Sequence, residues 1–196
     1  MRLSTLIPFL ALALVSAAAA LTTDQLLTIS PNSLSCANAP AAGECATAAD
    51  AVPIINDVFT SYLIYSPGEQ AALLSLMAFE TGDFKYNRNH FPGVAGQGTR
   101  NMQSPSFNKQ YASSIPEIKD RVNNNVSATL DLLLSRAHWD FGSAAWFLTT
   151  QCSEEVRLGL LQGSQAGWEA YISGCVNTTV TEERRAYWKR AVDVLF

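Results

Sequence analysis

The sequence predicts a mainly α-helical protein with one long polar loop. Apolar residues recur at steps of three and four in most segments after residue 50, which places them on one face of a helix. Hydrophobic residues make up 48% of the chain and charged residues 15%, a composition typical of a packed core. Residues 83–105 show no helical period and contain several Gly, Asn and Pro, so we expect a long loop or a small β-ribbon there.

The first twenty residues have the pattern of a secretory signal peptide. Arg2 precedes an apolar core, Leu6–Val15, and Ala18–Ala20 matches a cleavage site. The apolar core is shorter than a membrane span, and no later apolar run is long enough for one. We therefore expect a secreted, extracellular protein that begins at Leu21 and does not associate with a membrane after cleavage.

The charge of the mature chain argues against nucleic acid as a partner. Loss of Arg2 with the signal peptide leaves 12 basic residues against the 17 acidic ones, so the formal net charge changes from −4 to −5. A negative protein is repelled by phosphate groups and by anionic membrane surfaces. We expect a monomer.

An even number of cysteines follows the cleavage site: Cys36, Cys45, Cys152 and Cys175. In a secreted chain this number indicates two disulfides. Three pairings are possible. We favour Cys36–Cys45 and Cys152–Cys175, because both close short segments between neighbouring elements.

The mature chain divides into an arm and a domain. Residues 21–49 are rich in Ala, Ser, Thr, Asn and Pro, which predicts an irregular arm pinned by its two cysteines. Residues 50–196 are expected to form a single domain. Its first helix spans Asp50–Tyr65, where apolar residues have helical spacing.

The second helix has clear start and stop signals. Ser66 can cap it, Pro67 fits the first helical position, and Glu69 completes a capping box. The helix is expected to end near Glu80, because Gly82 can take the left-handed conformation that follows many helices.

Further helices are expected after the loop. Apolar residues at steps of three and four define a long helix over Pro116–Ser135. Asn125 lies off this apolar stripe, so the sequon Asn125-Val-Ser127 should be exposed, and a second sequon begins at Asn177. Both are expected to carry glycans if the host is eukaryotic. Shorter helices are expected at residues 106–111, 141–150, 154–161, 165–172 and 182–194.

Glu80 is the leading candidate for a catalytic residue. It follows a run of apolar residues and precedes the polar loop, so desolvation should raise its proton affinity, as a general acid requires. Asp83 is a candidate second carboxylate, although it could equally cap a loop or form a turn. Four further side chains are candidates for substrate contact: Tyr86, His90, Gln103 and Tyr111.

Other chemistries have less support. His90 and His138 are the only histidines, and no HExxH or CxxC spacing occurs, so neither a metal nor another cofactor is expected. The sequence lacks the GxSxG turn of α/β-hydrolases and a nucleotide-binding phosphate loop. The basic cluster near the C-terminus is expected to be a solvated helix face; it comprises Arg184, Arg185, Lys189 and Arg190.

Two segments resemble the lysozyme-like superfamily, particularly goose-type lysozymes and lytic transglycosylases. LLSLMAFETGDF looks like the helix-Glu-Ser/Thr-Gly segment of that superfamily, and GVAGQGTRNMQSP resembles its glycine-rich segment with a Met-Gln pair, here Met102-Gln103. Ala144–Phe147 is similar to the helix behind the cleft. Two departures are present: Arg100 and Asn101 stand where Gly and Leu are usual, and a late Ala-Tyr-Asn segment is absent.

The resemblance implies a lysozyme-like helical domain with the loop or ribbon beside the catalytic helix. It implies a secreted glycoside hydrolase, or lytic enzyme of carbohydrate metabolism, that cleaves a β-linked polysaccharide such as peptidoglycan, chitin or chitosan. Glu80 would protonate the glycosidic oxygen, and Gln103 would position the substrate. Asp83 would act as base or stabiliser, unless the substrate's N-acetyl group assists instead. The alternative is a non-catalytic carbohydrate-binding or effector protein on the same scaffold.

Overall fold

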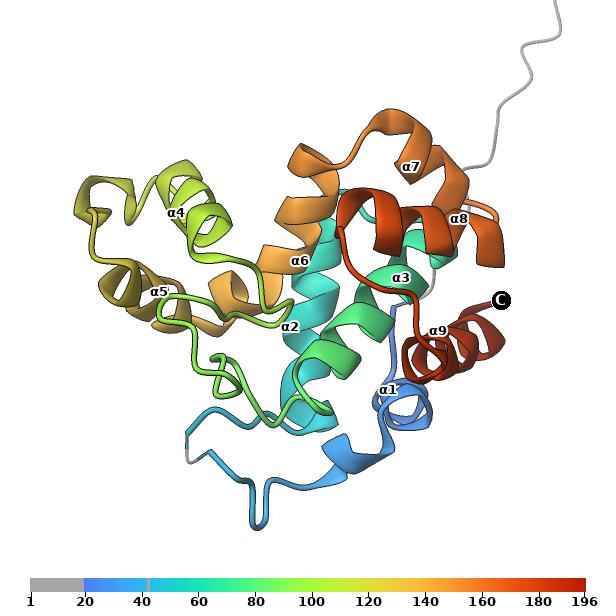
Figure 1. Cartoon of the computed structure of the whole chain (residues 1–196). Helices are drawn as coiled ribbons and strands as arrows, with labels where there is room; N and C mark the ends of the chain where they lie inside the picture. Colours follow the sequence, from blue (N-terminus) through green and yellow to red (C-terminus); the bar gives the residue numbers. More distant parts are fainter. Residues whose placement is uncertain (1–19, 42) are drawn as a thin grey trace, which may run out of the picture.

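The structure, a computed structural model, describes residues 20–41 and 43–196. The predicted signal peptide therefore lies almost wholly outside the described residues. The described part is mainly α-helical, which confirms the expected fold class (Figure 1). In this part no helix is both long enough and apolar enough to cross a membrane.

Three helices form the centre of the molecule: α2 (Ala48–Ser61), α3 (Pro67–Glu80) and α6 (Ala137–Gln151). Every residue of α3 from Gly68 to Ala78 is buried. In Figure 1, α4 and α5 lie on one side of these helices, and α1 and α9 lie on the other. A helix buried all round has a fixed axis, so the residue at its end, Glu80, has a fixed position.

The ends of α3 agree with the prediction. Ser66 caps the helix, Pro67 occupies its first turn, and Thr81 follows Glu80 as the C-cap. Gly82 then has a φ of 56°, and the left-handed conformation continues through Asp83 and Phe84. The capping box, however, does not form, because the Glu69 carboxylate pairs with Arg157 Nε at 2.8 Å.

The predicted long helix at Pro116–Ser135 is wrong. A 3₁₀ turn, Lys119–Arg121, is followed by α5 (Val126–Leu134), and Asn125 caps α5 by accepting a hydrogen bond from the Ala128 N–H at 3.0 Å. Asn side chains favour such caps over helix interiors, which explains the break. The preceding helix, α4 (Pro105–Ser114), is longer than expected.

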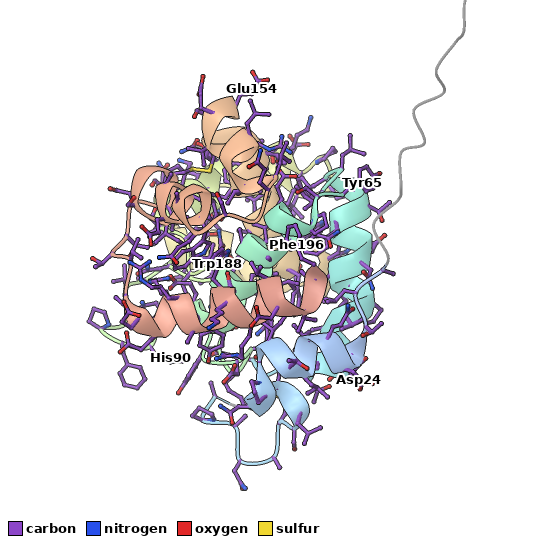
Figure 2. All side chains as sticks on the ribbon, turned by 90° about the vertical axis from the view of Figure 1, so that its right-hand side faces the viewer. Asp24, Tyr65, His90, Glu154, Trp188 and Phe196 are labelled. Atoms are coloured by element: carbon purple, nitrogen blue, oxygen red, sulfur yellow. A yellow bond between two sulfur atoms is a disulfide. The ribbon has the colours of Figure 1, made fainter. Side chains whose placement is uncertain are left out.

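The C-terminal part contains α7 (Glu154–Leu160), α8 (Gln165–Ala170), a π-helical turn (Tyr171–Cys175) and α9 (Glu182–Leu195). Figure 2 shows α9 crossing the face of the molecule, with Trp188 on it and Phe196 at its end. The disulfides are Cys36–Cys45 and Cys152–Cys175, the pairing favoured by the spacing. Asn125 and Asn177 are both exposed, so their glycosylation remains a prediction.

The arm is more regular than predicted. It contains α1 (Thr23–Ile29), which starts with a capping box between Thr22 and Gln25, and a 3₁₀ turn at Pro31–Leu34. The helix forms because Leu26 and Ile29 are fully buried in the main core, and it packs against α9.

The polar loop (residues 83–105) contains no strand within the described residues. Two isolated antiparallel bridges, Arg88 with Gly98 and Gly98 with Gln103, take the place of a β-ribbon. A Cβ atom on Gly98 would lie only 2.5 Å from the Asn87 carbonyl oxygen. The loop is therefore held tightly folded against the end of α3.

Candidate functional site

A cleft of two adjoining hollows lies at the end of α3. Both hollows are lined by Glu80, Gln97 and Met102. The inner hollow, of about 260 Å³, has further walls from Leu76, Asn101, Gln103, Ser104, Phe107, Phe147, Val176, Thr178 and Arg184. The outer hollow, of about 290 Å³, has further walls from Gly82, Tyr86, Arg88, Asn89, His90 and Phe91.

Glu80 lies between the hollows and is paired with Arg184. Arg184 Nη1 donates to Glu80 Oε1 at 2.6 Å, and the guanidinium carbon lies 4.1 Å from the centre of the Phe79 ring. The Glu80 side chain is 19% exposed and the Arg184 side chain 11%. Arg184 is therefore not part of a solvated helix face, which corrects that prediction. The Glu80 carboxylate thus already has a charged hydrogen-bond partner within the cleft.

Asp83 lies outside the cleft. Its buried carboxylate accepts hydrogen bonds from Ser30 Oγ at 2.5 Å, Asn32 Nδ2 at 2.7 Å and Tyr187 Oη at 3.0 Å. These bonds join the arm and α9 to the turn after α3. Asp83 lines neither hollow, so the geometry supports its alternative role as a structural turn residue.

Of the four predicted contact residues, three line the cleft. Tyr86 and His90 belong to the outer hollow and Gln103 to the inner one. The Gln103 amide is already engaged, because Nε2 donates to Asn108 Oδ1 at 2.8 Å. Tyr111 is buried beneath this wall against Trp146, with ring centres 5.1 Å apart, and burial raises the pKa of its phenol.

Arg100 fixes the polar loop from within. Its guanidinium donates to Asp140 Oδ2 at 2.8 Å and to the carbonyl oxygens of Phe84, Tyr86 and Glu44 at 3.1, 3.1 and 2.8 Å. Burial raises the pKa of Asp140, while Arg100 acts in the opposite direction. Arg100, one of the two departures from the lysozyme-like pattern, is thus a structural residue of this loop.

Glu44 was not identified from the sequence. Its carboxylate Oε1 lies 2.8 Å from His90 Nε2, and its Oε2 accepts the backbone N–H groups of Asn87 and Arg88. The only local signal is its position beside Cys45, because its contacts are with residues more than forty positions away.

The described residues contain few side chains that are placed to coordinate a metal ion. Within residues 20–41 and 43–196, no cluster of three or more His, Cys, Asp or Glu side chains is suited to a metal ion. All four cysteines are in disulfides. His90 is paired with Glu44, and His138 with Asp57.

Comparison with known proteins gives one informative relative. The chain is 45% identical over 150 residues to the bifunctional dioxygenase (DOX)-epoxy alcohol synthase (EAS) of Fusarium oxysporum (strain Fo5176). The alignment covers 72% of this chain but 12% of the relative. An alignment that covers 72% of the chain must include its middle part, wherever the alignment begins. Glu80 and the polar loop lie in that part. No protein-family model matches the sequence, and no solved structure matches it significantly.

The relative corrects the predicted function. Its name describes a dioxygenase and an epoxy alcohol synthase, which is oxidative chemistry, whereas the lysozyme-like pattern implied a hydrolase acting on polysaccharides. The predictions of a glycosidase and of carbohydrate metabolism are therefore wrong. The superfamily resemblance rested on short motifs around Glu80 and Met102-Gln103, while the similarity to the relative extends over most of the chain.

Proposed function

We propose that this chain takes part in oxidative chemistry of the type named for its relative, and that it binds an oxygenated amphiphilic molecule in the cleft. The observation that carries this proposal is the 45% identity, over an alignment that includes Glu80 and the polar loop. The chain spans only 12% of the relative, so the proposal concerns a part of that chemistry.

The two faces of the cleft suit an epoxy alcohol, the product class in the relative's name. Such a molecule has a hydroxyl donor, an epoxide oxygen that accepts, and a hydrocarbon remainder. The Glu80 carboxylate can accept from the hydroxyl, and Arg184 can donate to the epoxide oxygen. Apolar walls of the inner hollow, among them Phe107 and Phe147, can cover the hydrocarbon.

The residues support a binding role better than a redox centre. Dioxygen chemistry relies on a metal or an organic cofactor, and metals are held by His, Cys and carboxylate side chains. In the described part of the chain no such cluster is present, and both histidines are paired with carboxylates. The proposal concerns binding of the oxygenated molecule in the cleft.

Calorimetric titration tests this proposal. An epoxy alcohol with a linear hydrocarbon chain should bind the purified protein more tightly than the alcohol of equal length without the epoxide. Arg184→Gln should weaken binding of the epoxy alcohol by roughly tenfold, the effect of losing one charged hydrogen bond. Lys189→Gln makes the same charge change on the exposed side of α9 and should bind as the wild type does. Equal binding of both alcohols, or an unaffected Arg184→Gln protein, would contradict the proposal.

We also propose that the chain is secreted. Two disulfides support this proposal, because such bonds persist in oxidising compartments. Expression of the full chain in a fungal host, followed by N-terminal sequencing of protein from the medium, tests it. A protein that stays inside the cell and still carries residues 1–20 would contradict the proposal.

The lysozyme-like relationship remains a proposal about fold alone. It is supported by the position of Glu80 at the end of a buried helix that faces a glycine-containing loop with Met102-Gln103. An experimentally determined structure that superposes on a lysozyme-like domain would support it, and a different order of helices around the cleft would contradict it.

A further inference from the structure

We infer that Glu44 and His90 form a proton-transfer pair in the outer hollow, in which His90 exchanges a proton with a bound molecule through Nδ1 and Glu44 positions the ring. His90 lines the same hollow as Glu80, and the action of the pair on an epoxy alcohol rests on the proposed function. Its geometry and its intrinsic reactivity do not depend on that ligand.

Glu44 is held at both its main chain and its side chain. The buried Arg100 donates to its carbonyl oxygen at 2.8 Å, and its neighbour Cys45 is in a disulfide with Cys36. The N–H groups of Asn87 and Arg88 donate to Oε2 at 3.0 and 3.2 Å. With these constraints, Oε1 has a fixed position 2.8 Å from His90 Nε2.

The contacts of Glu44 determine where neutral His90 carries its proton. Oε2 accepts two backbone N–H groups, and a carboxylate can only accept hydrogen bonds. Nε2 must then be the donor, which leaves the lone pair of Nδ1 free. Nδ1 makes no hydrogen bond to any described residue, and the ring lines the outer hollow, which Glu80 also lines. A histidine oriented by a carboxylate at one nitrogen is the arrangement that enzymes use for proton transfer at the other.

The basic side chains that follow α3 in the polar loop contact groups other than the Glu44 carboxylate. Arg88 Nη2 pairs with Asp131 Oδ1 at 2.7 Å, and the Lys85 ammonium contacts the Ser35 carbonyl oxygen. Tyr86 packs against the His90 ring, with centres 5.4 Å apart. The Arg100 guanidinium contacts Glu44 at its main-chain carbonyl oxygen, so His90 is the side-chain partner of the carboxylate, and Tyr86 restricts the orientation of the ring.

The second histidine provides an internal comparison. His138 Nδ1 pairs with Asp57 at 2.8 Å, but the Asp57 side chain is 69% exposed, whereas that of Glu44 is 13% exposed. Neither His138 nor Asp57 lines the cleft, whereas His90 lines its outer hollow. His138 and Asp57 thus form a surface pair. The His138 ring is about as exposed as the His90 ring, but it is paired through Nδ1 instead of Nε2. Figure 2 shows His90 at the side of the molecule on which α9 begins, far from Phe196.

Nuclear magnetic resonance of ¹⁵N-labelled histidine tests the geometry in the ligand-free protein. Neutral His90 should carry its proton on Nε2, with slow exchange of that proton, and neutral His138 should carry it on Nδ1. Glu44→Gln should accelerate exchange of the His90 Nε2 proton and leave His138 unchanged, with an unchanged circular dichroism spectrum. A His90 ring protonated on Nδ1, or unaltered exchange in Glu44→Gln, would overturn the inference.

Hydrolysis of 4-nitrophenyl acetate tests the reactivity. Nδ1 takes a proton from water as the water oxygen attacks the ester carbonyl; 4-nitrophenolate then leaves, acetic acid forms, and the ring gives its proton to solvent. His90→Gln should lower the rate constant by about 10²-fold, the lower end for a positioned acid–base group. Glu44→Gln should lower it less, and His138→Gln should not change it. Wild-type rates in His90→Gln would overturn the inference, whereas absence of epoxy alcohol binding would affect only the proposed function.

Discussion

Arg184 Nη1 lies 2.6 Å from Glu80 Oε1, and this ion pair joins the first turn of α9 to the last turn of α3. The pair connects residues 104 positions apart in the sequence. Both residues line the inner hollow, where Glu80 presents its carboxylate together with the Arg184 guanidinium. The same contact therefore contributes to the stability of the fold and to the chemistry of the cleft.

Loss of Arg184 should destabilise the protein because Glu80 would remain partly buried without its partner. Arg184→Gln is expected to lower the free energy of unfolding by about 1–3 kcal/mol, between the values for exposed and buried pairs. Urea denaturation measures this change. The control Lys189→Gln should change it by less than about 0.5 kcal/mol, because Lys189 is exposed. Similar losses in both variants would show that net charge, and not the ion pair, matters.

Asp83 should matter for stability and not for ligand binding. Asp83→Asn removes the charge from the acceptor of three hydrogen bonds, so the free energy of unfolding should fall by about 1.5–3 kcal/mol. Asp131→Asn, at a carboxylate that is mostly exposed, makes the same charge change and should have little effect. A direct role of Asp83 in the cleft would appear instead as weaker ligand binding with unchanged stability.

Alkaline pH should destabilise the protein through Tyr187. Burial, together with the nearby Asp83 carboxylate, raises the pKa of Tyr187 from 10.0 to about 12. The unfolded chain then loses this proton first as the pH rises. The stabilising effect is complete below pH 10 and is lost progressively as the pH approaches about 12.

Urea denaturation at several alkaline pH values measures this effect, and Tyr187→Phe should reduce the decline. The decline should not vanish, because burial also raises the pKa values of Tyr111 and Tyr171. Tyr65→Phe, at an exposed side chain, provides the control. An identical decline in wild type and Tyr187→Phe would refute the assignment.

Local signals in the sequence predicted the elements that depend on local chemistry. The start of α3 followed from Ser66 and Pro67, and its end from Gly82, since caps and turn residues act within a few positions. The apolar stripe after Pro116 was misleading. Ile115 and Ile118 are buried in an apolar cluster with Leu133, but Asn125 caps a new helix.

Long-range contacts could not be predicted in this way. Arg184 looked like part of a basic helix face, and its pairing with Glu80 depends on how α9 packs against α3. Glu44 occurs in a segment without hydrophobic period, and it meets His90 only because the polar loop folds back on the arm. Glu80, Tyr86, His90 and Gln103 were predicted from the sequence as site residues, whereas the places of Arg184 and Glu44 are known only from the fold.

The buried Arg100 should be the residue on which the polar loop depends most. Its guanidinium makes hydrogen bonds to Asp140 and to three carbonyl oxygens, and it lies 4.7 Å from the centre of the Phe141 ring. Lysine keeps the charge but has a single nitrogen, which cannot reproduce the planar fork of the guanidinium. Arg100→Lys should therefore lower the free energy of unfolding by about 3 kcal/mol, as expected when a buried ionic network is broken.

A matched control is available in the same loop. Arg88 pairs with Asp131 at 2.7 Å, but the two side chains are 38% and 61% exposed, so Arg88→Lys should lower the free energy of unfolding by at most about 1 kcal/mol. Urea denaturation compares the two variants. Hydrogen exchange of residues 84–103, measured by mass spectrometry, should accelerate in Arg100→Lys alone, because the carbonyl groups of Phe84, Tyr86 and Glu44 lose their common donor. Wild-type exchange in Arg100→Lys would show that the backbone bridges, and not Arg100, hold the loop in place beside Glu80.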